Sequence, residues 1–302
     1  MRYLLVGLGN IGRKRQALLG DRCVATADPF NTEADFETAE ECPVDTYDAA
    51  VLATPNSLKL RLLESFLETG KHVLVEKPLL LPDAETAARL QRLARQRHVV
   101  CYTSYNHRYE TLIERARQHL ASGRTGSIYH VRLFYGNGTV GNVVGTWRDQ
   151  GLGVLEDLGS HLLDLSAELL GCRGDLFKPV SLERHEATSF DHCVFTSNDG
   201  RIVLEASYLS WRNTFTVDVF GSRGSLHLVG LQKWGPSQLI LRERVIPSGV
   251  PIEVEEQAPG GVDPTWSRDI DHFEQLCAEE SPSTSLDNDW WISQTLHTVA
   301  GA

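Results

Sequence analysis

Apolar and polar positions follow two periods in the first third of the chain. Short apolar runs, typical of strands buried on both faces, alternate with stretches whose apolar residues recur at the helical period. The expected strands are residues 3–6, 23–27, 48–53, 72–75 and 99–103, and the expected helices are residues 12–19, 58–68, 82–97 and 105–121. This order predicts a doubly wound parallel sheet with helices between its strands.

The pattern changes after residue 120. Helical periods return near the end, and strand-like runs joined by turn signals come before them, at residues 128–135, 193–197, 202–211, 215–220 and 225–228. The loop 136–145, rich in glycine and asparagine, is expected to be flexible unless it borders a site. The sequence therefore predicts an α/β protein with two domains. Residues 1–119 form the doubly wound parallel sheet, and residues 120–302 form a C-terminal α+β domain with a largely antiparallel open sheet.

Composition narrows the classes of partner. With a formal net charge of −11 over 302 residues, we expect no nucleic-acid partner. No apolar stretch approaches the roughly 20 residues of a membrane span, and the chain enters a strand at once, so we expect neither a membrane anchor nor a signal peptide. The six cysteines are scattered without a C-x-x-C pair. This pattern favours a reducing cytoplasm and predicts neither a disulfide framework nor a metal site.

The first candidate site lies where the first expected strand ends. Gly7, Gly9 and Gly12 stand in G-x-G-x-x-G spacing. The first glycine permits a tight turn, the second lets the backbone approach a pyrophosphate, and the third lets helix pack on strand. The amides at Asn10 and Ile11 would then face the anion. A glycine-rich turn without a ligand is the alternative, but the flanking strands favour a dinucleotide-binding Rossmann domain.

An acid ends the second expected strand. Asp28 lies 21 residues after Gly7, where a carboxylate accepts hydrogen bonds from an adenosine ribose. No arginine follows it in residues 28–31 to meet a 2′-phosphate, so NAD is the expected cofactor. Arg13, Lys14 and Arg15 leave NADP open, because they are either a solvated surface cluster or cations near the cofactor phosphates.

Two polar segments follow later strands of the same sheet. Thr54-Pro55-Asn56 comes after the third expected strand, and Glu76-Lys77-Pro78 comes after the fourth. Ligands bind beyond the carboxyl ends of strands in such sheets, so we expect both segments at the cofactor crevice. The proline favours an extended backbone at Lys77, which predicts an ammonium near the nicotinamide. A surface lysine in a βα loop is the alternative.

Asp157 and His161 form the third candidate cluster. Read as one α-helix, they lie at i and i+4, with their Cβ atoms about 5–6 Å apart. Leucines at 155, 158, 162, 165 and 169 form the core-facing stripe of this helix. A carboxylate one turn away can orient an imidazole or raise its pKa, as a general acid/base requires. A structural histidine with satisfied hydrogen bonds is the alternative.

Together, the glycine turn, the Glu76-Lys77-Pro78 triplet and the Asp157/His161 pair resemble the Gfo/Idh/MocA family (glucose–fructose oxidoreductase, inositol dehydrogenase, MocA). Thr54-Pro55-Asn56, Asn106-x-Arg108 and Trp147-Arg148 are similar to further features of that family. The resemblance spans nearly the whole chain. It implies a Rossmann domain followed by an α/β domain that binds substrate and whose open sheet forms the interface of a homodimer or homotetramer.

The resemblance also implies an activity, namely NAD(P)-dependent hydride transfer between nicotinamide and a hydroxyl carbon of a sugar, cyclitol or related polyol. His161 would take the hydroxyl proton, Lys77 would polarise the same oxygen, and Asp157 would position the substrate. Substrate contacts would come from Asn106, Arg108, Trp147, Arg148, Asp157 and His161, and the Lys77–Pro78 bond would be cis. Lys59, Arg15 and Leu152 depart from the family pattern; the first and third would alter substrate or nicotinamide contacts.

Two other functions stay open. A non-catalytic NAD-binding sensor or assembly subunit would keep the fold and bind NAD without turnover. An NAD-recycling lyase or glycosidase would oxidise one carbon transiently and release no net NADH.

Overall fold

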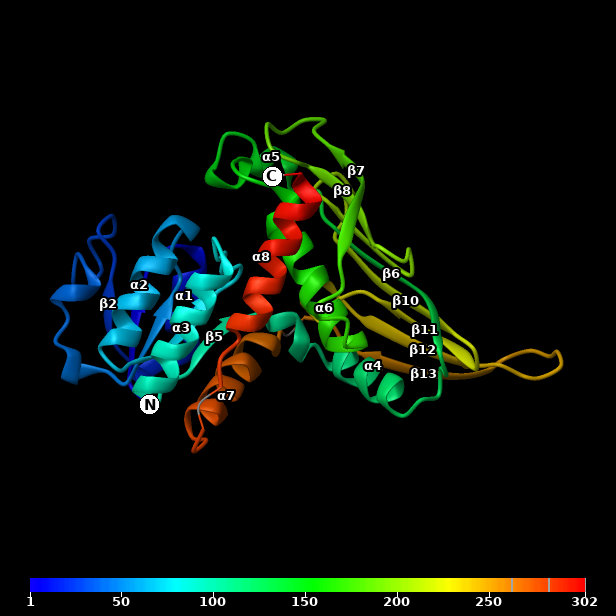
Figure 1. Ribbon diagram of the computed structural model, residues 1–302, viewed down its shortest axis with the longest axis horizontal. Coiled ribbons are helices and arrows are strands. Elements are labelled where there is room, and N and C mark those ends of the chain that lie inside the picture. The colour runs from blue at the N-terminus through cyan, green and yellow to red at the C-terminus, as the bar shows by residue number, and fades with distance from the viewer. Residues whose placement is uncertain (262, 282, 302) are drawn as a thin grey trace. The chain divides into compact units, whose positions relative to one another are not determined.

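The structure is a computed structural model that describes residues 1–261, 263–281 and 283–301. It contains two compact units, each with its own sheet (Figure 1). The first unit comprises Met1–Asn106 and Trp266–Ser293, and the second comprises His107–Thr265 and Gln294–Ala302. Within the described ranges, no helix combines the length and the apolar character needed to cross a membrane.

The sheet of the first unit has five parallel strands in the order β2-β1-β3-β4-β5, which confirms the predicted doubly wound sheet. The order reverses between β1 and β3, so the carboxyl ends of these strands form the switch point at which such sheets bind ligands. Strands and helices alternate along the chain as β1 (Tyr3–Val6), α1 (Asn10–Leu19), β2 (Cys23–Ala27), β3 (Ala49–Leu52), α2 (Asn56–Glu68), β4 (His72–Glu76), α3 (Ala84–Arg97) and β5 (Cys101–Ser104).

Apolar side chains cover both faces of this sheet, as buried parallel strands require. One core joins α2, α3 and the start of α8 (Leu286–Ala300), with Leu63 and Leu90 fully buried. The other joins α1 and α7 (Thr265–Cys277), with Phe273 fully buried. Residues 266–293 belong to the first compact unit because their apolar faces complete these two cores. The domain boundary predicted from the sequence places them in the domain 120–302. The functional roles of residues 1–119 and 120–302 stay predictions.

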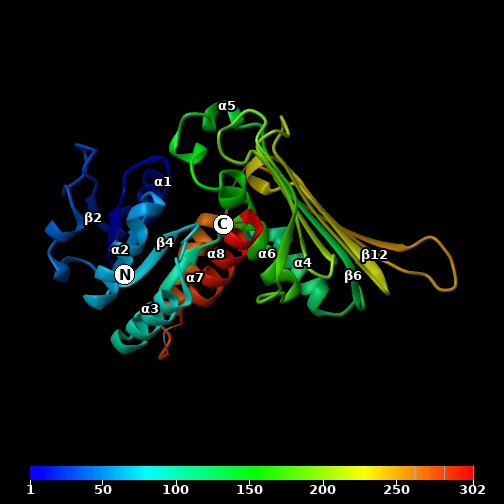
Figure 2. The same cartoon turned by 45° about the horizontal axis from the view of Figure 1, so that its top comes forward.

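The sheet of the second unit has eight strands in the order β13-β12-β11-β10-β6-β9-β8-β7. Every neighbouring pair is antiparallel except β6 with β9, which confirms the largely antiparallel sheet. Helices α4 (Thr111–Ala121) and α6 (Ser160–Leu170) pack on one face (Figures 1 and 2). The strands are β6 (Ile128–Gly136), β7 (Phe177–Glu183), β8 (His192–Ser197), β9 (Ile202–Ser207), β10 (Thr214–Gly221), β11 (Gly224–Val229), β12 (Ser237–Glu243) and β13 (Ile252–Ala258).

Three strands were not expected from the sequence: β7, β12 and β13. β7 and β13 are the two edges of the sheet. Edge strands carry prolines and charges that weaken the strand pattern, here Pro179 in β7 and Glu253 and Glu255 in β13. Strand β12 is internal and shows the usual alternation, with Leu239 and Leu241 buried.

Two local expectations need correction. The expected helix 105–121 is two elements, a 3₁₀ turn at Asn106–Tyr109 and then α4, because Glu110 between them is extended. The loop 136–145 contains one short helix, α5 (Val140–Val143).

Candidate functional site

The turn after β1 has the geometry that its glycine spacing predicts. Gly7 has a φ of +95°, and a Cβ there would lie 2.5 Å from the Ala53 carbonyl oxygen. A Cβ at Gly12 would overlap the Gly7 carbonyl oxygen, whereas a Cβ at Gly9 would meet no described atom within 4 Å. Gly7 and Gly12 therefore close the turn against β3 and α1, and Gly9 leaves room for a ligand to approach the backbone.

The first amides of α1 precede its internal hydrogen bonds. The helix's first bond runs from Arg13 N to Gly9 O at 2.9 Å, so the amides of Asn10, Ile11 and Gly12 have no acceptor within the helix. Among the described residues, no side chain caps this end of the helix, and the first turn of the helix contains no acidic residue. An anion is favoured here by the amides and by the positive end of the helix dipole.

Asp28 follows β2 beside this turn. Its Oδ2 accepts a 2.7 Å hydrogen bond from Leu8 N, and its Oδ1 accepts a 2.8 Å bond from Phe30 N. Each carboxylate oxygen keeps a second lone pair, so the oriented acid retains the capacity to accept from a ribose diol.

The three cations after the glycine turn have different surroundings. Arg13 is exposed and pairs with Glu33 at 2.7 Å, so a carboxylate offsets its charge in the loop that follows Asp28. The Lys14 ammonium lies 5.7 Å from the centre of the Trp266 ring. Arg15 is fully buried, and the reading of these residues as one solvated or phosphate-facing cluster is wrong for it.

The segment after β3 contributes an unsatisfied hydroxyl. Thr54 Oγ1 is buried and has no hydrogen-bond partner within the described part of the chain, as expected of a donor that awaits a ligand. The space at Gly9, the uncapped amides of α1 and this hydroxyl lie at the ends of β1 and β3. Together they fit a dinucleotide bound at the switch point of the sheet.

A buried lysine ties this segment to the turn after β4. Lys59 Nζ donates to Asn56 Oδ1 at 2.7 Å and to the Pro78 carbonyl oxygen at 2.8 Å. Its side chain is 3% exposed, so the ammonium depends on these acceptors in place of water. Lys59 therefore joins α2 to the Glu76-Lys77-Pro78 turn.

Arg15 holds the other part of that turn. Its Nε donates to Glu76 Oε1 at 2.6 Å, and its Nη2 donates to Asp269 Oδ2 of α7 at 2.8 Å and to Ser104 Oγ of β5. Burial by itself would lower the pKa of Arg15, but Glu76 and Asp269 outweigh it and raise the pKa above its ordinary value. The half-buried Lys77 follows directly, with a cis bond to Pro78, as the resemblance implied.

Asp157 lies in a π-helical turn, Leu155–Gly159, that runs directly into α6. The single α-helix expected through Asp157 and His161 is therefore wrong, and the wider π turn changes their spacing. Such turns occur frequently at functional sites. Asp157 Oδ2 accepts a 3.0 Å hydrogen bond from the Tyr208 hydroxyl. Burial, with a further contribution from Asp157, raises the pKa of Tyr208, so its hydroxyl remains a donor.

His161 is 4% exposed and lies among rings. Its ring centre is 4.0 Å from that of His107 and 5.9 Å from that of Tyr135. His107 Nε2 is in turn 3.2 Å from Lys233 Nζ and 3.4 Å from the Tyr135 hydroxyl. The second unit therefore surrounds the predicted base with groups that donate and accept protons.

The remaining predicted substrate contacts differ in their surroundings. Asn106 is buried, and Arg108 forms a two-point ion pair with Asp164 of α6, from Nε to Oδ2 at 2.7 Å and from Nη2 to Oδ1. This pairing fixes the arginine against α6. Arg148 is exposed on the 3₁₀ turn Trp147–Asp149, and the side chain of Trp147 lies outside the described residues.

The sequence did not point to four members of the His161 surroundings: His107, Tyr135, Tyr208 and Lys233. They come from the 3₁₀ turn at Asn106–Tyr109, from β6, from the residue directly after β9 and from the 3₁₀ turn Gln232–Trp234. No spacing rule connects such distant segments.

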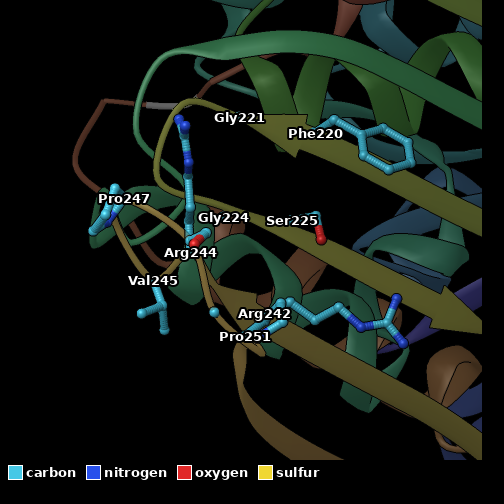
Figure 3. A pocket seen from close by; sticks show the side chains of 11 residues that line it. Phe220, Gly221, Gly224, Ser225, Arg242, Arg244, Val245, Pro247 and Pro251 are labelled. Atoms are coloured by element: carbon cyan, nitrogen blue, oxygen red, sulfur yellow. The ribbon is translucent and has the colours of Figure 1, made fainter.

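A shallow pocket of about 410 Å³ lies elsewhere in the second unit, at the end of β10, the start of β11 and the end of β12 (Figure 3). Ser225, Arg242 and Arg244 line it together with turn residues. Arg242 is already paired with Glu253 at 2.6 Å. None of the predicted site residues whose side chains the structure describes lines this pocket.

Two family models match the chain. The model described as "Oxidoreductase family, NAD-binding Rossmann fold" matches residues 1–105, and the "GFO/IDH/MocA C-terminal domain" matches residues 113–227. The chain is 30% identical over 220 residues to the uncharacterized oxidoreductase YdgJ of Escherichia coli, covering 69% of this chain and 63% of YdgJ. It is 27% identical over 213 residues to the inositol 2-dehydrogenase of Rhizobium meliloti, covering 66% and 62%. The match thus spans less than two thirds of either relative's own length.

Among solved structures, levoglucosan dehydrogenase in complex with NADH and levoglucosan matches at a TM-score of 0.79 and 18% identity, covering 100% of this chain and 96% of that one. At this identity the likeness shows a shared fold. The two family models, which match residues from each of the two sheets, assign the chain to a family. The chain belongs to the Gfo/Idh/MocA family of oxidoreductases, with an NAD-binding Rossmann fold in its N-terminal part.

Proposed function

We propose that the protein is an NAD-dependent dehydrogenase acting on a hydroxyl carbon of a sugar, cyclitol or related polyol. NADP stays open as an alternative cofactor. The observation that carries the proposal is the buried His161, whose ring centre is 4.0 Å from that of His107 and which follows the π turn that contains Asp157. A general base needs a fixed imidazole near groups that can exchange or orient protons.

Bound NAD would accept the hydride that leaves the carbon, and the chain's own residues would handle the oxygen. His161 takes the hydroxyl proton on a ring nitrogen as the carbon gains carbonyl character. Lys77 donates a hydrogen bond to the same oxygen. Asp157, oriented by the Tyr208 hydroxyl at 3.0 Å, accepts from a neighbouring substrate hydroxyl. This division of roles requires Lys77 and His161 to meet at one substrate, which stays a prediction.

The nature of the substrate is inferred from chemistry and from relatives. The inositol 2-dehydrogenase and the levoglucosan dehydrogenase among the similar proteins are named for polyhydroxylated rings. The chain's net charge of −11 disfavours heavily phosphorylated substrates. In this proposal Asn106 and Arg148 contact the substrate, and Arg108, held by Asp164, supports the site. Trp147 keeps its predicted substrate role.

We also assign substrate binding and self-association to residues 120–302, as a homodimer or homotetramer in the cytoplasm. The open eight-stranded sheet supports this assignment, because a broad sheet face is suited to pairing with a second copy. Light scattering coupled to gel filtration would test it. A monomer at micromolar concentration would contradict it.

The activity is tested with a panel of inositols, hexoses, anhydrosugars, sugar phosphates and nucleotide sugars, each incubated with NAD or NADP. NADH absorbance and product are measured together, with Lys77→Met as the matched variant. NADH formed by the parent protein and lost in the variant supports the proposal. NAD binding without turnover on any substrate would instead identify a sensor or assembly subunit. Product without net NADH would identify a redox-neutral lyase or glycosidase.

A further inference from the structure

A half-buried lysine lies in the cluster around His161. Lys233 belongs to the 3₁₀ turn Gln232–Trp234 between β11 and β12. Its Nζ lies 3.2 Å from His107 Nε2 and 3.2 Å from the Tyr135 hydroxyl, and it is 4.8 Å from the centre of the Trp234 ring. These contacts fix a positive charge beside two histidines. The roles proposed above leave this lysine unused.

We propose that Lys233 is a positioning residue that keeps His161 in its neutral, proton-accepting form by acting through His107. The inference rests on the proposed function, in which His161 accepts the substrate proton.

The first step concerns the protonation of His107. A lysine ammonium carries donors only, so its contact with His107 Nε2 requires a lone pair on that nitrogen. His107 is then neutral, with its proton on Nδ1. The Tyr135 hydroxyl lies near both groups, 3.4 Å from His107 Nε2 and 3.2 Å from Lys233 Nζ. A second proton on His107 would place two cations 3.2 Å apart, which Coulomb repulsion opposes.

The second step carries this effect to His161. The two imidazole ring centres are 4.0 Å apart, with the planes inclined at 65°. A proton on His161 would therefore add a positive charge one ring away from the ammonium of Lys233. In a site shielded from water, a nearby like charge disfavours the charged form of a titratable group. Lys233 thus favours the imidazole that can act as a base.

Carboxylates near the cluster favour the protonated form of His161 and so oppose the effect of Lys233. Asp157 lies four residues before His161, in the π turn, and Asp263, Glu110 and Asp157 all attract the Lys233 ammonium. Burial lowers the pKa of Lys233, and these three acids oppose that change. Without the lysine, the acids would favour a protonated His161. Among the described residues, the titratable and charged groups that contact this cluster or act on it include His107, Glu110, Tyr135, Arg148, Glu156, Asp157, His161, Tyr208, Lys233 and Asp263.

The test is an NMR titration of the histidine side chains of the intact, isotope-labelled protein without substrate. His161→Asn identifies the His161 signal by its loss. Lys233→Met is expected to raise the His161 titration midpoint by about 1 pH unit, the usual size of a nearby-charge effect. Lys233→Arg retains the charge and should keep the midpoint of the parent. Lys178→Met removes an exposed lysine of the same unit and should also leave the midpoint in place.

Kinetics give the second readout. For an imidazole with an ordinary pKa of about 6.5, a rise of one unit lowers the neutral fraction about eightfold at pH 6 and far less as the pH rises. The acid limb of the kcat/KM pH profile should therefore shift to higher pH in Lys233→Met. Lys233→Arg should show the acid limb of the parent protein. Lys178→Met should retain the parent profile.

The outcomes separate the two proposals. An unmoved His161 midpoint in a folded Lys233→Met protein overturns the role of Lys233, whether or not the enzyme turns over. A shifted midpoint in a protein that oxidises no substrate would support the electrostatic coupling and reject the dehydrogenase. If Lys233→Met fails to fold, Lys233→Gln provides the comparison, because it also removes the charge and keeps a polar side chain. A His161 midpoint unmoved in Lys233→Gln would likewise overturn the proposal.

Discussion

The two predicted catalytic groups lie in settings of different kinds. Lys77 lies within a turn fixed by buried charges, with Arg15 bound to Glu76 at 2.6 Å and Lys59 bound to the Pro78 carbonyl at 2.8 Å. His161 lies in a cluster of rings, 4.0 Å from His107. A buried ion network that loses one partner leaves an uncompensated charge, at a high cost in stability. A ring cluster can lose one polar atom and keep its packing. Damage in the first setting should therefore appear mainly in stability, and damage in the second mainly in chemistry.

The largest effect is expected from His161→Asn, which removes the proposed base while keeping a polar side chain. The kcat should fall about 10²–10⁴-fold, the range for a lost general base, with NAD affinity nearly unchanged. NADH formation measures turnover, and calorimetry measures NAD affinity. His130→Asn is the control, because His130 is half-buried in the same unit and stacks on Phe220 at 6.2 Å. Parent-like turnover in His161→Asn would reject the assigned role.

Arg15→Met tests the charged setting. The change leaves Glu76 and Asp269 without their shared cation, so the free energy of unfolding should fall by about 3–5 kcal/mol. Urea denaturation measures it. Arg13→Met removes an exposed arginine paired with Glu33, and its cost should stay within about 1 kcal/mol. Equal losses in the two variants would contradict the idea that buried charge fixes the Lys77 turn.

Lys59→Met should have a smaller effect on stability and a measurable one on turnover. It removes two hydrogen bonds, to Asn56 and to the Pro78 carbonyl, and should cost about 1–3 kcal/mol of unfolding free energy. The loosened turn should lower kcat about tenfold, because a small misplacement of a catalytic group is costly. Lys71→Met is the matched control, since Lys71 Nζ donates to the Tyr47 carbonyl at 2.8 Å. It should lose stability without losing turnover.

The smallest expected effect is local and depends on pH. Asp149 accepts hydrogen bonds from the amides of Ser189, Gly145 and Thr188, and these hold its pKa well below the usual range. Its folded pKa lies below the unfolded value of about 3.9. The stabilisation is therefore full above that pH and is lost as the pH falls through the folded pKa.

Amide hydrogen exchange measures this effect. Protection of Gly145, Thr188 and Ser189 should persist to about pH 4 and decline below it, after correction for intrinsic rates. Asp149→Asn should lose much of the protection already at neutral pH. Asp199→Asn alters a turn carboxylate of the same unit, bound to Arg201 N at 3.0 Å, and should leave these three amides unchanged. Protection independent of residue 149 would show that the loop is held by other contacts.

Local sequence patterns predicted most of the structure of the first unit. Its five strands follow from apolar runs, and the geometry of Gly7 and Gly12 follows from their spacing. The partners of Arg15 did not follow, because Glu76, Ser104 and Asp269 belong to three other elements. In the second unit, the edge strands β7 and β13 were missed, since edges favour charges and proline over an alternating pattern. The π turn before His161 was also missed. One π-helical turn changes the helical period too briefly to show in the spacing of leucines along the sequence.

The sequence by itself determined the doubly wound sheet, the dinucleotide turn and the identities of Lys77, Asp157 and His161 as candidates. These depend on periodicity and on short spacings, which local chemistry dictates. The tertiary structure alone decided that Arg15 is buried in an ion network and that Lys233 and His107 lie beside His161. Contacts between distant segments depend on how the sheets and turns pack, and no local pattern encodes the partner that a buried charge or ring will meet.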